Sequence, residues 1–328
     1  MSGRRGLVLL AALLLAAALL AVMIGETPLG ASDYLAALTR PGSPVGEILW
    51  TIRAPRVVMA GLIGAALGLA GAALQGLLRN PLADPGVLGV SASSGLGAGL
   101  AIALGLAAVP GAIEIAALVG ALAAGVLVVV LAARFREPET LILLGVSISA
   151  FAGALSALVF NLSPSPVTTA EVLTWMLGSV ANRDWPDVAM TLAPASIGAL
   201  LVVWSARGLT MLTLGEETAA LSGLPMARLR AAAVAGASLL AGAAVAAAGI
   251  IGFVGLAAPH LVRRGAGEDP ARTLLPSALA GALLLVLADL AARVIPTEQE
   301  LKLGVVTALF GAPLFALVAW RAARSWRA

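Results

Sequence analysis

The sequence is dominated by long apolar runs in which charged side chains are almost absent, the first of them at residues 7–24. Only 11% of the residues are charged and 60% are hydrophobic, whereas soluble domains carry about 25% charged residues. So few charges cannot cover a water-facing surface, and most of the surface must therefore face the lipid bilayer. We predict an all-α membrane protein with one transmembrane domain over residues 1–328 and no soluble domain.

Hydropathy divides the chain into about ten spans, because a helix needs about 20 mostly apolar residues to cross a bilayer. The predicted spans are 7–24, 57–78, 91–109, 113–133, 141–161, 188–206, 229–248, 249–261, 274–294 and 305–320. Arg4 and Arg5 precede the first run, so a cleaved signal peptide is the alternative for that segment. The run is long for a signal peptide and many spans follow it, so we expect a retained helix.

Basic residues are distributed unevenly between the two sides that this topology defines. With the N-terminus inside, 14 of the 20 lysine and arginine residues fall in inner segments. The positive-inside rule then places both termini in the cytoplasm. The same rule explains the net charge of +3. No basic patch is interleaved with aromatic residues, so we expect no nucleic-acid partner.

Several chemistries are excluded by missing residues. The chain has no cysteine and a single histidine, His260, so it has no disulfide, thiolate nucleophile or multi-histidine metal site. Its single lysine, Lys302, lies between two leucines, so no phosphate-binding loop of the form GxxxxGK[ST] is present. We expect a non-catalytic protein without a cofactor or metal. If its transport is driven by ATP, the ATPase is a separate subunit.

Small residues recur at spacings that favour close packing of membrane helices. Two pairs of glycines have the GxxxG spacing, and three more repeat every third residue. They are Gly64 with Gly68, Gly95 with Gly99, and Gly249, Gly252 and Gly255. Such residues let backbones approach where lipid supplies no hydrophobic driving force.

Three polar segments are longer than plain turns, at residues 79–89, 163–186 and 208–228. Long connections in compact proteins are usually functional. Within the third, residues 216–221 are predicted to form a short helix that ends near Gly223 and Pro225.

Seven motifs, in order along nearly the whole chain, resemble the FecCD family of permease subunits of type II ABC importers. They are RAPR at 53–56, QGLLRNPLADPGVLG at 75–89, WMLGS at 175–179, LGEETAALSGLP at 214–225, GFVGLAAPHLVRR at 252–264, LADLAAR at 287–293 and GVVTALFGAPLF at 304–315. The sequence departs from the family's common pattern at two places where a proline is usual, now Ile250 and Lys302. Lys302 adds a positive charge near the predicted outer mouth.

The resemblance implies a type II ABC importer permease fold with ten helices per subunit, in a bacterial inner membrane. It also implies a homodimer with the pathway between the copies, two ATP-binding cassette subunits and a periplasmic substrate-binding protein. The cargo would be an iron–siderophore complex, haem or vitamin B12. The sequence does not choose among these, because specificity in such systems lies largely in the binding protein.

Arg53, Arg56 and Arg293 lie at the predicted outer ends of their spans, on the side that the positive-inside rule disfavours. The resemblance implies that arginines here dock carboxylates of the binding protein, and arginine–carboxylate pairs are strong and directional. The alternative is that these arginines only anchor helix ends at the membrane interface.

The resemblance assigns the ATPase contact to the 208–228 loop, with Leu214, Gly215, Glu216, Ala219 and Gly223 at its core. A short helix in a partner's groove transmits rigid-body motion, and the alternative is a solvated loop. The family also places an inner gate at the start of the fifth span, here Glu139 and Thr140.

Two single residues leave alternatives open. Asp289 lies inside the ninth span, where it either relays protons, as in an ion-coupled secondary transporter, or pairs with Arg293 four residues later. We favour the pairing, because a secondary transporter predicts several embedded carboxylates. His260 is either a haem or metal ligand or a helix-end hydrogen-bonding group, and the chain offers no second ligand.

Overall fold

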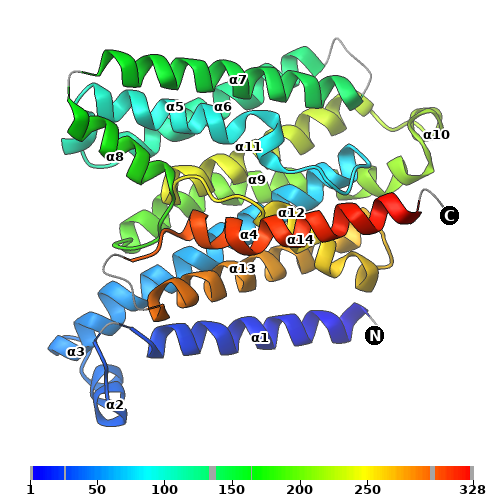
Figure 1. Cartoon of the computed structure of the whole chain (residues 1–328). Helices are drawn as coiled ribbons and strands as arrows, with labels where there is room; N and C mark the ends of the chain where they lie inside the picture. Colours follow the sequence, from blue (N-terminus) through cyan, green and yellow to red (C-terminus); the bar gives the residue numbers. More distant parts are fainter. Residues whose placement is uncertain (1–2, 26, 133–137, 164, 296–299, 326–328) are drawn as a thin grey trace.

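The computed structural model describes residues 3–25, 27–132, 138–163, 165–295 and 300–325, and these residues form helices and turns without a strand. Seven helices in this part are long and apolar enough to cross a membrane. Their main segments are α1 (Gly3–Met23), α4 (Ala54–Leu77), α6 (Ala112–Ala132), α7 (Pro138–Leu162), α9 (Trp185–Met211), α11 (Met226–Ala248) and α13 (Pro270–Val294). Figure 1 shows these helices side by side along a common direction.

The other three predicted spans differ from this regular pattern. The 91–109 prediction was too long, because α5 (Val90–Ala103) ends before Gly105, whose φ of +75° starts a 3₁₀ turn. The 249–261 prediction was also too long. There α12 (Val254–Val262) begins only after Gly249 and Phe253, which both have positive φ. The last span corresponds to α14 (Leu303–Ser325). The count of about ten is therefore approximate.

Short helices fill the connections between the spans. They are α2 (Ala31–Thr39), α3 (Pro44–Glu47), α8 (Pro166–Met176) and α10 (Glu216–Leu221), and a π-helical turn, Ile48–Arg53, joins α3 to α4. The outer segment 163–186, predicted to be more than a plain turn, contains the helix α8, which the sequence analysis did not predict. The Ser165 side chain caps α8 by accepting a hydrogen bond from the Val167 N–H, and Pro166 occupies its first turn.

The centre of the bundle is the contact between α4 and α13, built on close approach of backbones. A Cβ at Gly64 would lie 2.2 Å from the Gly281 carbonyl oxygen, and one at Gly68 would lie 2.2 Å from that of Ser277. The first GxxxG prediction is therefore confirmed. The second was wrong in detail, since α5 approaches the α6 backbone through Gly97 rather than through Gly95 or Gly99.

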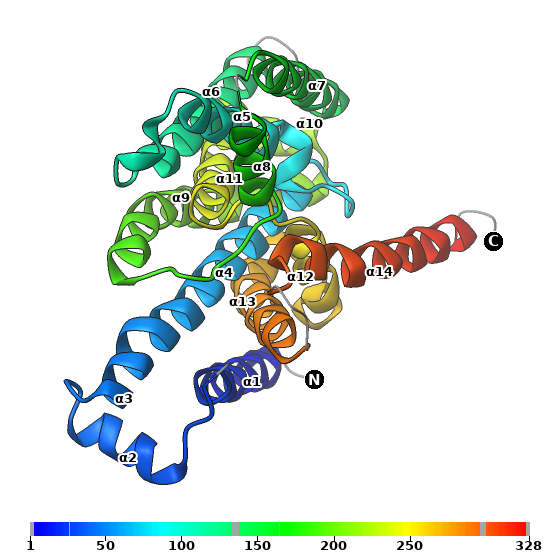
Figure 2. The same cartoon turned by 60° about the vertical axis from the view of Figure 1, so that its left-hand side comes forward.

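The two ends of the bundle differ in what they carry. In Figure 1 the N-terminus, the C-terminus and α10 lie at one end, and α2 and α3 lie at the other. Both views place α1 beside α13 at one edge and α7 at the opposite edge, and Figure 2 shows α14 directed away from the bundle. We call the end with α2 and α3 the outer end and the end with α10 the inner end.

Candidate functional site

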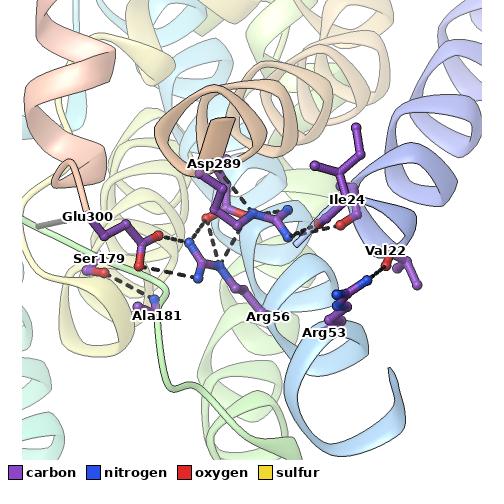
Figure 3. Close-up of polar contacts among 10 residues, drawn as sticks. Val22, Ile24, Arg53, Arg56, Ser179, Ala181, Asp289 and Glu300 are labelled. Atoms are coloured by element: carbon purple, nitrogen blue, oxygen red, sulfur yellow. Dashed lines mark hydrogen bonds and ion pairs between the residues drawn. The ribbon is translucent and has the colours of Figure 1, made fainter. Parts of the chain in front are cut away.

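The arginine motif at the start of α4 lies in a charged cluster at the outer end (Figure 3). Arg56 Nη2 lies 2.8 Å from Asp289 Oδ1 of α13, and its Nε donates to the same carboxylate at 3.0 Å. Arg56 also pairs with Glu300, which precedes α14. Asp289 has a second partner, because Arg293 Nη2 lies 2.9 Å from its Oδ2. We call Arg56, Asp289, Arg293 and Glu300 the outer charge cluster.

The members of the outer charge cluster differ in exposure. The side chains of Asp289 and Arg293 are 2% and 4% exposed, whereas those of Arg56 and Glu300 are 13% and 25% exposed. Solvent screens a buried ion pair only weakly, and removing one partner of such a pair is strongly destabilising. The Arg56–Glu300 pair is the part of the cluster that an incoming group reaches first.

Arg53 and Arg293 also bind the C-terminal end of α1. Arg53 Nη1 donates to the carbonyls of Val22 and Met23, each at 3.2 Å. Arg293 Nη1 donates to those of Ala21 and Ile24, each at 2.9 Å. The last carbonyls of a helix lack partners inside it and carry its negative dipole end, so two guanidinium groups satisfy them well.

The structure thus gathers the three predicted docking arginines at one place, but with different surroundings. The predicted i,i+4 pairing of Asp289 with Arg293 is confirmed. Arg53 is buried and the Arg293 side chain is 4% exposed, both against backbone carbonyls, so Arg56 has the most accessible side chain of the three. Sequence reasoning missed Glu300 as a member of the cluster. The signal available in the sequence was its place shortly before the last predicted span, and in the structure it lies three residues before α14.

The inner end carries the predicted coupling loop, and its short helix has the predicted bounds, Glu216–Leu221. Gly215 and Gly223 flank it with φ of +98° and +83°, and a Cβ at either would meet no atom within 4 Å. The conformation of the loop therefore needs glycine for its backbone angles rather than for packing within the chain. Both glycines border α10 and fix where the chain enters and leaves it.

One face of α10 packs on the bundle and the other is open. Ala219 is buried, and Glu216 pairs with Arg230 of α11, with 2.6 Å between Oε2 and Nη2. Leu214 and Leu221, by contrast, are 69% and 85% exposed. Leu214 ends the 3₁₀ turn before α10 and Leu221 ends α10 itself, and exposed apolar side chains on both sides of a well-anchored short helix are typical of a surface that a partner covers.

The predicted gate residues Glu139 and Thr140 lie in the first turn of α7. Thr140 is half-buried, and the side chain of Glu139 lies outside the part of the chain that the structure describes. Lys302 directly precedes α14, and its carbonyl accepts from the N–H groups of Val305 and Val306 in the first turn of that helix.

A polar contact that the sequence did not predict joins three elements in the inner half. Gln75 is buried on α4, donates to the Ala83 carbonyl at 3.3 Å and accepts from Arg263, just after α12. In the same turn, burial raises the pKa of the Asp84 carboxyl, although a hydrogen bond from the Gly86 N–H opposes this shift.

His260 is half-buried on α12, and the described residues hold no group of three potential metal ligands.

Comparisons with known proteins agree with this architecture. The FecCD transport family matches residues 13–321. The chain is 42% identical over 287 residues to the uncharacterized ABC transporter permease protein YvrB of Bacillus subtilis (strain 168), across 86% of this chain and 81% of YvrB. It is 38% identical over 323 residues to the vitamin B12 import system permease protein BtuC of Shigella flexneri, across 98% of this chain and 96% of BtuC.

A solved structure has the same fold. It is described as an inward-facing conformation of a metal-chelate type ABC transporter, and it superposes with a TM-score of 0.86 at 30% identity, covering 96% of this chain and 98% of that one. The chain therefore belongs to the FecCD transport family. It is a multi-pass membrane protein with the type II ABC importer permease fold. It acts as the translocation subunit of an ABC transporter and is not an enzyme.

Proposed function

We propose that this chain forms a homodimeric permease that moves a bulky iron chelate, haem or vitamin B12 from the periplasm to the cytoplasm, as one membrane domain of 328 residues. The observation that carries the proposal is its 38% identity to BtuC, a vitamin B12 import permease, over 98% of the chain. The outer end would face the periplasm, and both termini and α10 would lie in the cytoplasm, in agreement with the positive-inside rule.

A second copy of the chain accounts for the position of α14. Figure 2 shows this helix directed away from its own bundle, and Leu309 and Phe310 on it are 66% and 71% exposed. In a two-fold dimer the same surface would meet its counterpart, and the pathway would run between the two copies.

The outer charge cluster is the proposed contact with a periplasmic binding protein. A partner carboxylate that approaches Arg56 meets Glu300 first, because Glu300 is the most exposed member of the cluster. Docking would then exchange an internal carboxylate for an external one, while Asp289 holds the guanidinium in place. Arg53 and Arg293 would contribute positive potential at short range and fix α1, α4 and α13 beneath the contact.

The loop around α10 is the proposed contact with each of two ATP-binding cassette subunits. Leu214 and Leu221 would enter a groove of the ATPase, and Ala219 and the Glu216–Arg230 pair would pass its motion to α11. Gly215 and Gly223 would set the orientation of α10. Glu139 and Thr140, at the same end, remain the proposed inner gate.

An ion-coupled secondary transporter is the alternative, and Asp289 is the residue that would support it. Both oxygens of its carboxylate are already paired with arginines, as expected of a structural ion pair rather than of a group open to an ion pathway. The importer proposal is therefore the stronger one.

The test of the proposal is cargo uptake by liposomes that contain this chain with its ATPase and binding protein. Cyanocobalamin, a ferric siderophore and haem would be offered separately, and the proposal predicts ATP-dependent accumulation of one of the three. Matched liposomes without the binding protein are the control and should show little uptake. Failure to accumulate any of the three, in liposomes whose ATPase is active, would contradict the cargo class.

A further inference from the structure

A groove that the transport proposal does not use opens at the inner end, between α1, α13 and the 3₁₀ turn after α12, Arg263–Ala266. Its volume is ≈ 740 Å³. Its depth is apolar, with Leu7 and Leu10 on the α1 side and Leu275 on the α13 side. In both views α1 lies at the edge of the bundle, where the surface of a membrane protein meets lipid, and we infer that the groove opens toward the bilayer.

The mouth of the groove is basic. It is lined by Arg4, from the first turn of α1, and Arg272, from the first turn of α13. Leu7 and Leu10 follow Arg4 by three and six residues, which is about 4.5 Å and 9 Å deeper along the helix axis. The groove therefore changes from cationic to apolar over the distance that separates a lipid phosphate from the first part of its acyl chain.

Both arginines retain most of their capacity for an anion. The Arg272 side chain is 79% exposed, and its nearest carboxylate oxygen, on Asp269, is 3.5 Å away. Only Oδ2 of that carboxylate faces Arg272, because Oδ1 accepts from the Thr210 hydroxyl at 2.6 Å and from the Ala271 N–H at 2.9 Å. Arg4 makes no ion pair with any residue that the structure describes. Glu268 is exposed close by and is the one further acidic group of this turn.

We propose that the groove binds one anionic phospholipid, with its phosphate between Arg4 and Arg272 and an acyl chain along Leu7, Leu10 and Leu275. Basic pockets between membrane helices on the cytoplasmic side suit such headgroups, and guanidinium groups bind phosphate oxygens in pairs. A bound lipid would fill the space between α1 and the turn after α12. It would thereby hold α1 against α13 at the end opposite to the arginine caps of Arg53 and Arg293.

Arginines at inner helix ends are expected in any membrane protein, so the proposal must be separated from general attraction to anionic lipid. The chain supplies a matched control. Arg5 and Arg264 are also exposed at the inner end, but they do not line the groove. Removing either pair lowers the positive charge of this end by the same amount.

The experiment measures lipid retention by native mass spectrometry and melting temperature in zwitterionic nanodiscs doped with phosphatidylglycerol or cardiolipin. Each hydrogen-bonded contact of a guanidinium with the phosphate is worth at least about a tenfold change in affinity, so Arg4→Gln with Arg272→Gln should weaken retention by about 100-fold. Arg5→Gln with Arg264→Gln should retain the lipid and its stabilising effect. Equal losses in both pairs, or no loss in the first, would overturn the proposal.

A steric variant tests the groove without changing charge. A Cβ at Gly265, which lines the groove, would meet no atom within 4 Å, so Gly265→Phe should fill the groove and displace the lipid while the protein folds normally. Glycerol phosphate, a headgroup without acyl chains, should leave the melting temperature unchanged. A shift equal to that of the intact lipid would instead identify a site for free phosphate esters and overturn the lipid proposal.

Discussion

Replacing Asp289 by asparagine keeps the shape of the side chain but removes the charge that two arginines share. Asp289 lies 2.8 Å from Arg56 and 2.9 Å from Arg293, and its side chain is 2% exposed. Removing one partner of a buried ion pair costs about 3–5 kcal/mol, because the remaining charge stays buried without compensation. Arg56 keeps Glu300, so we expect a loss in the free energy of unfolding near the lower value, about 3 kcal/mol.

The loss would be measured by reversible denaturant unfolding in mixed micelles. Glu114→Gln is a matched control at the same end of the bundle. Glu114 Oε1 lies 2.9 Å from Arg183 Nη1, but these side chains are 23% and 18% exposed, so the control should lose less than about 1 kcal/mol. In a double-mutant cycle, Asp289→Asn and Arg293→Gln together should cost about 1–3 kcal/mol less than the sum of the single changes. Equal losses for Asp289→Asn and the control would refute the reasoning.

Three further predictions concern packing, coupling and docking. Gly64→Leu should destabilise the bundle by at least about 3 kcal/mol, because its Cβ would overlap the Gly281 carbonyl; the melting temperature would show this. Gly215→Leu and Gly223→Leu should leave the melting temperature of the bundle nearly unchanged but weaken co-purification of the ATPase, since a side chain at positive φ costs about 1–2 kcal/mol and changes the orientation of α10. Glu300→Gln should raise affinity for the binding protein about fivefold in a surface-binding assay, because the internal competitor of the docking carboxylate is lost.

Each of these three predictions has a control variant and an outcome that would contradict it. Gly6→Leu, where a Cβ meets nothing within 4 Å, should be tolerated, and equal damage from both leucines would disprove the packing argument. ATPase recovery at the wild-type level with both loop variants would remove the coupling role of α10. For docking, Arg56→Glu should abolish binding of the binding protein. High salt should weaken the binding of the wild-type chain. A fall in affinity with Glu300→Gln would mean that Glu300 supports the dock rather than competes with it.

The sequence predicted the parts of the fold that depend on local pattern. Apolar runs located the long helices, the GxxxG spacing of Gly64 and Gly68 located a point of close backbone approach on α4, and an i,i+4 spacing located the Asp289–Arg293 pair. Family resemblance located the loop whose helix, Glu216–Leu221, has the predicted bounds. Each of these signals is local, because it lies within a single helix or a single loop.

The rest depended on contacts between distant segments. Nothing near Arg53 or Arg293 indicates that both guanidinium groups bind the last carbonyls of α1, because those carbonyls are about 30 and 270 residues away. Glu300 joins the cluster only because the folded chain returns to the start of α4 before α14. The helix α8 was missed because its mixed, partly polar sequence, PVTTAEVLTWM, has neither the length nor the hydropathy of a span.

As the proposed permease of an ABC importer, this chain should move cargo only when a partner ATPase hydrolyses ATP. The direct measurement is cargo uptake by liposomes in which that ATPase carries a substitution of its catalytic carboxylate, with a proton or sodium gradient imposed across the membrane. The account predicts that uptake stops with the inactive ATPase, whatever the gradient, and returns with the active one. Accumulation driven by the gradient alone would contradict it.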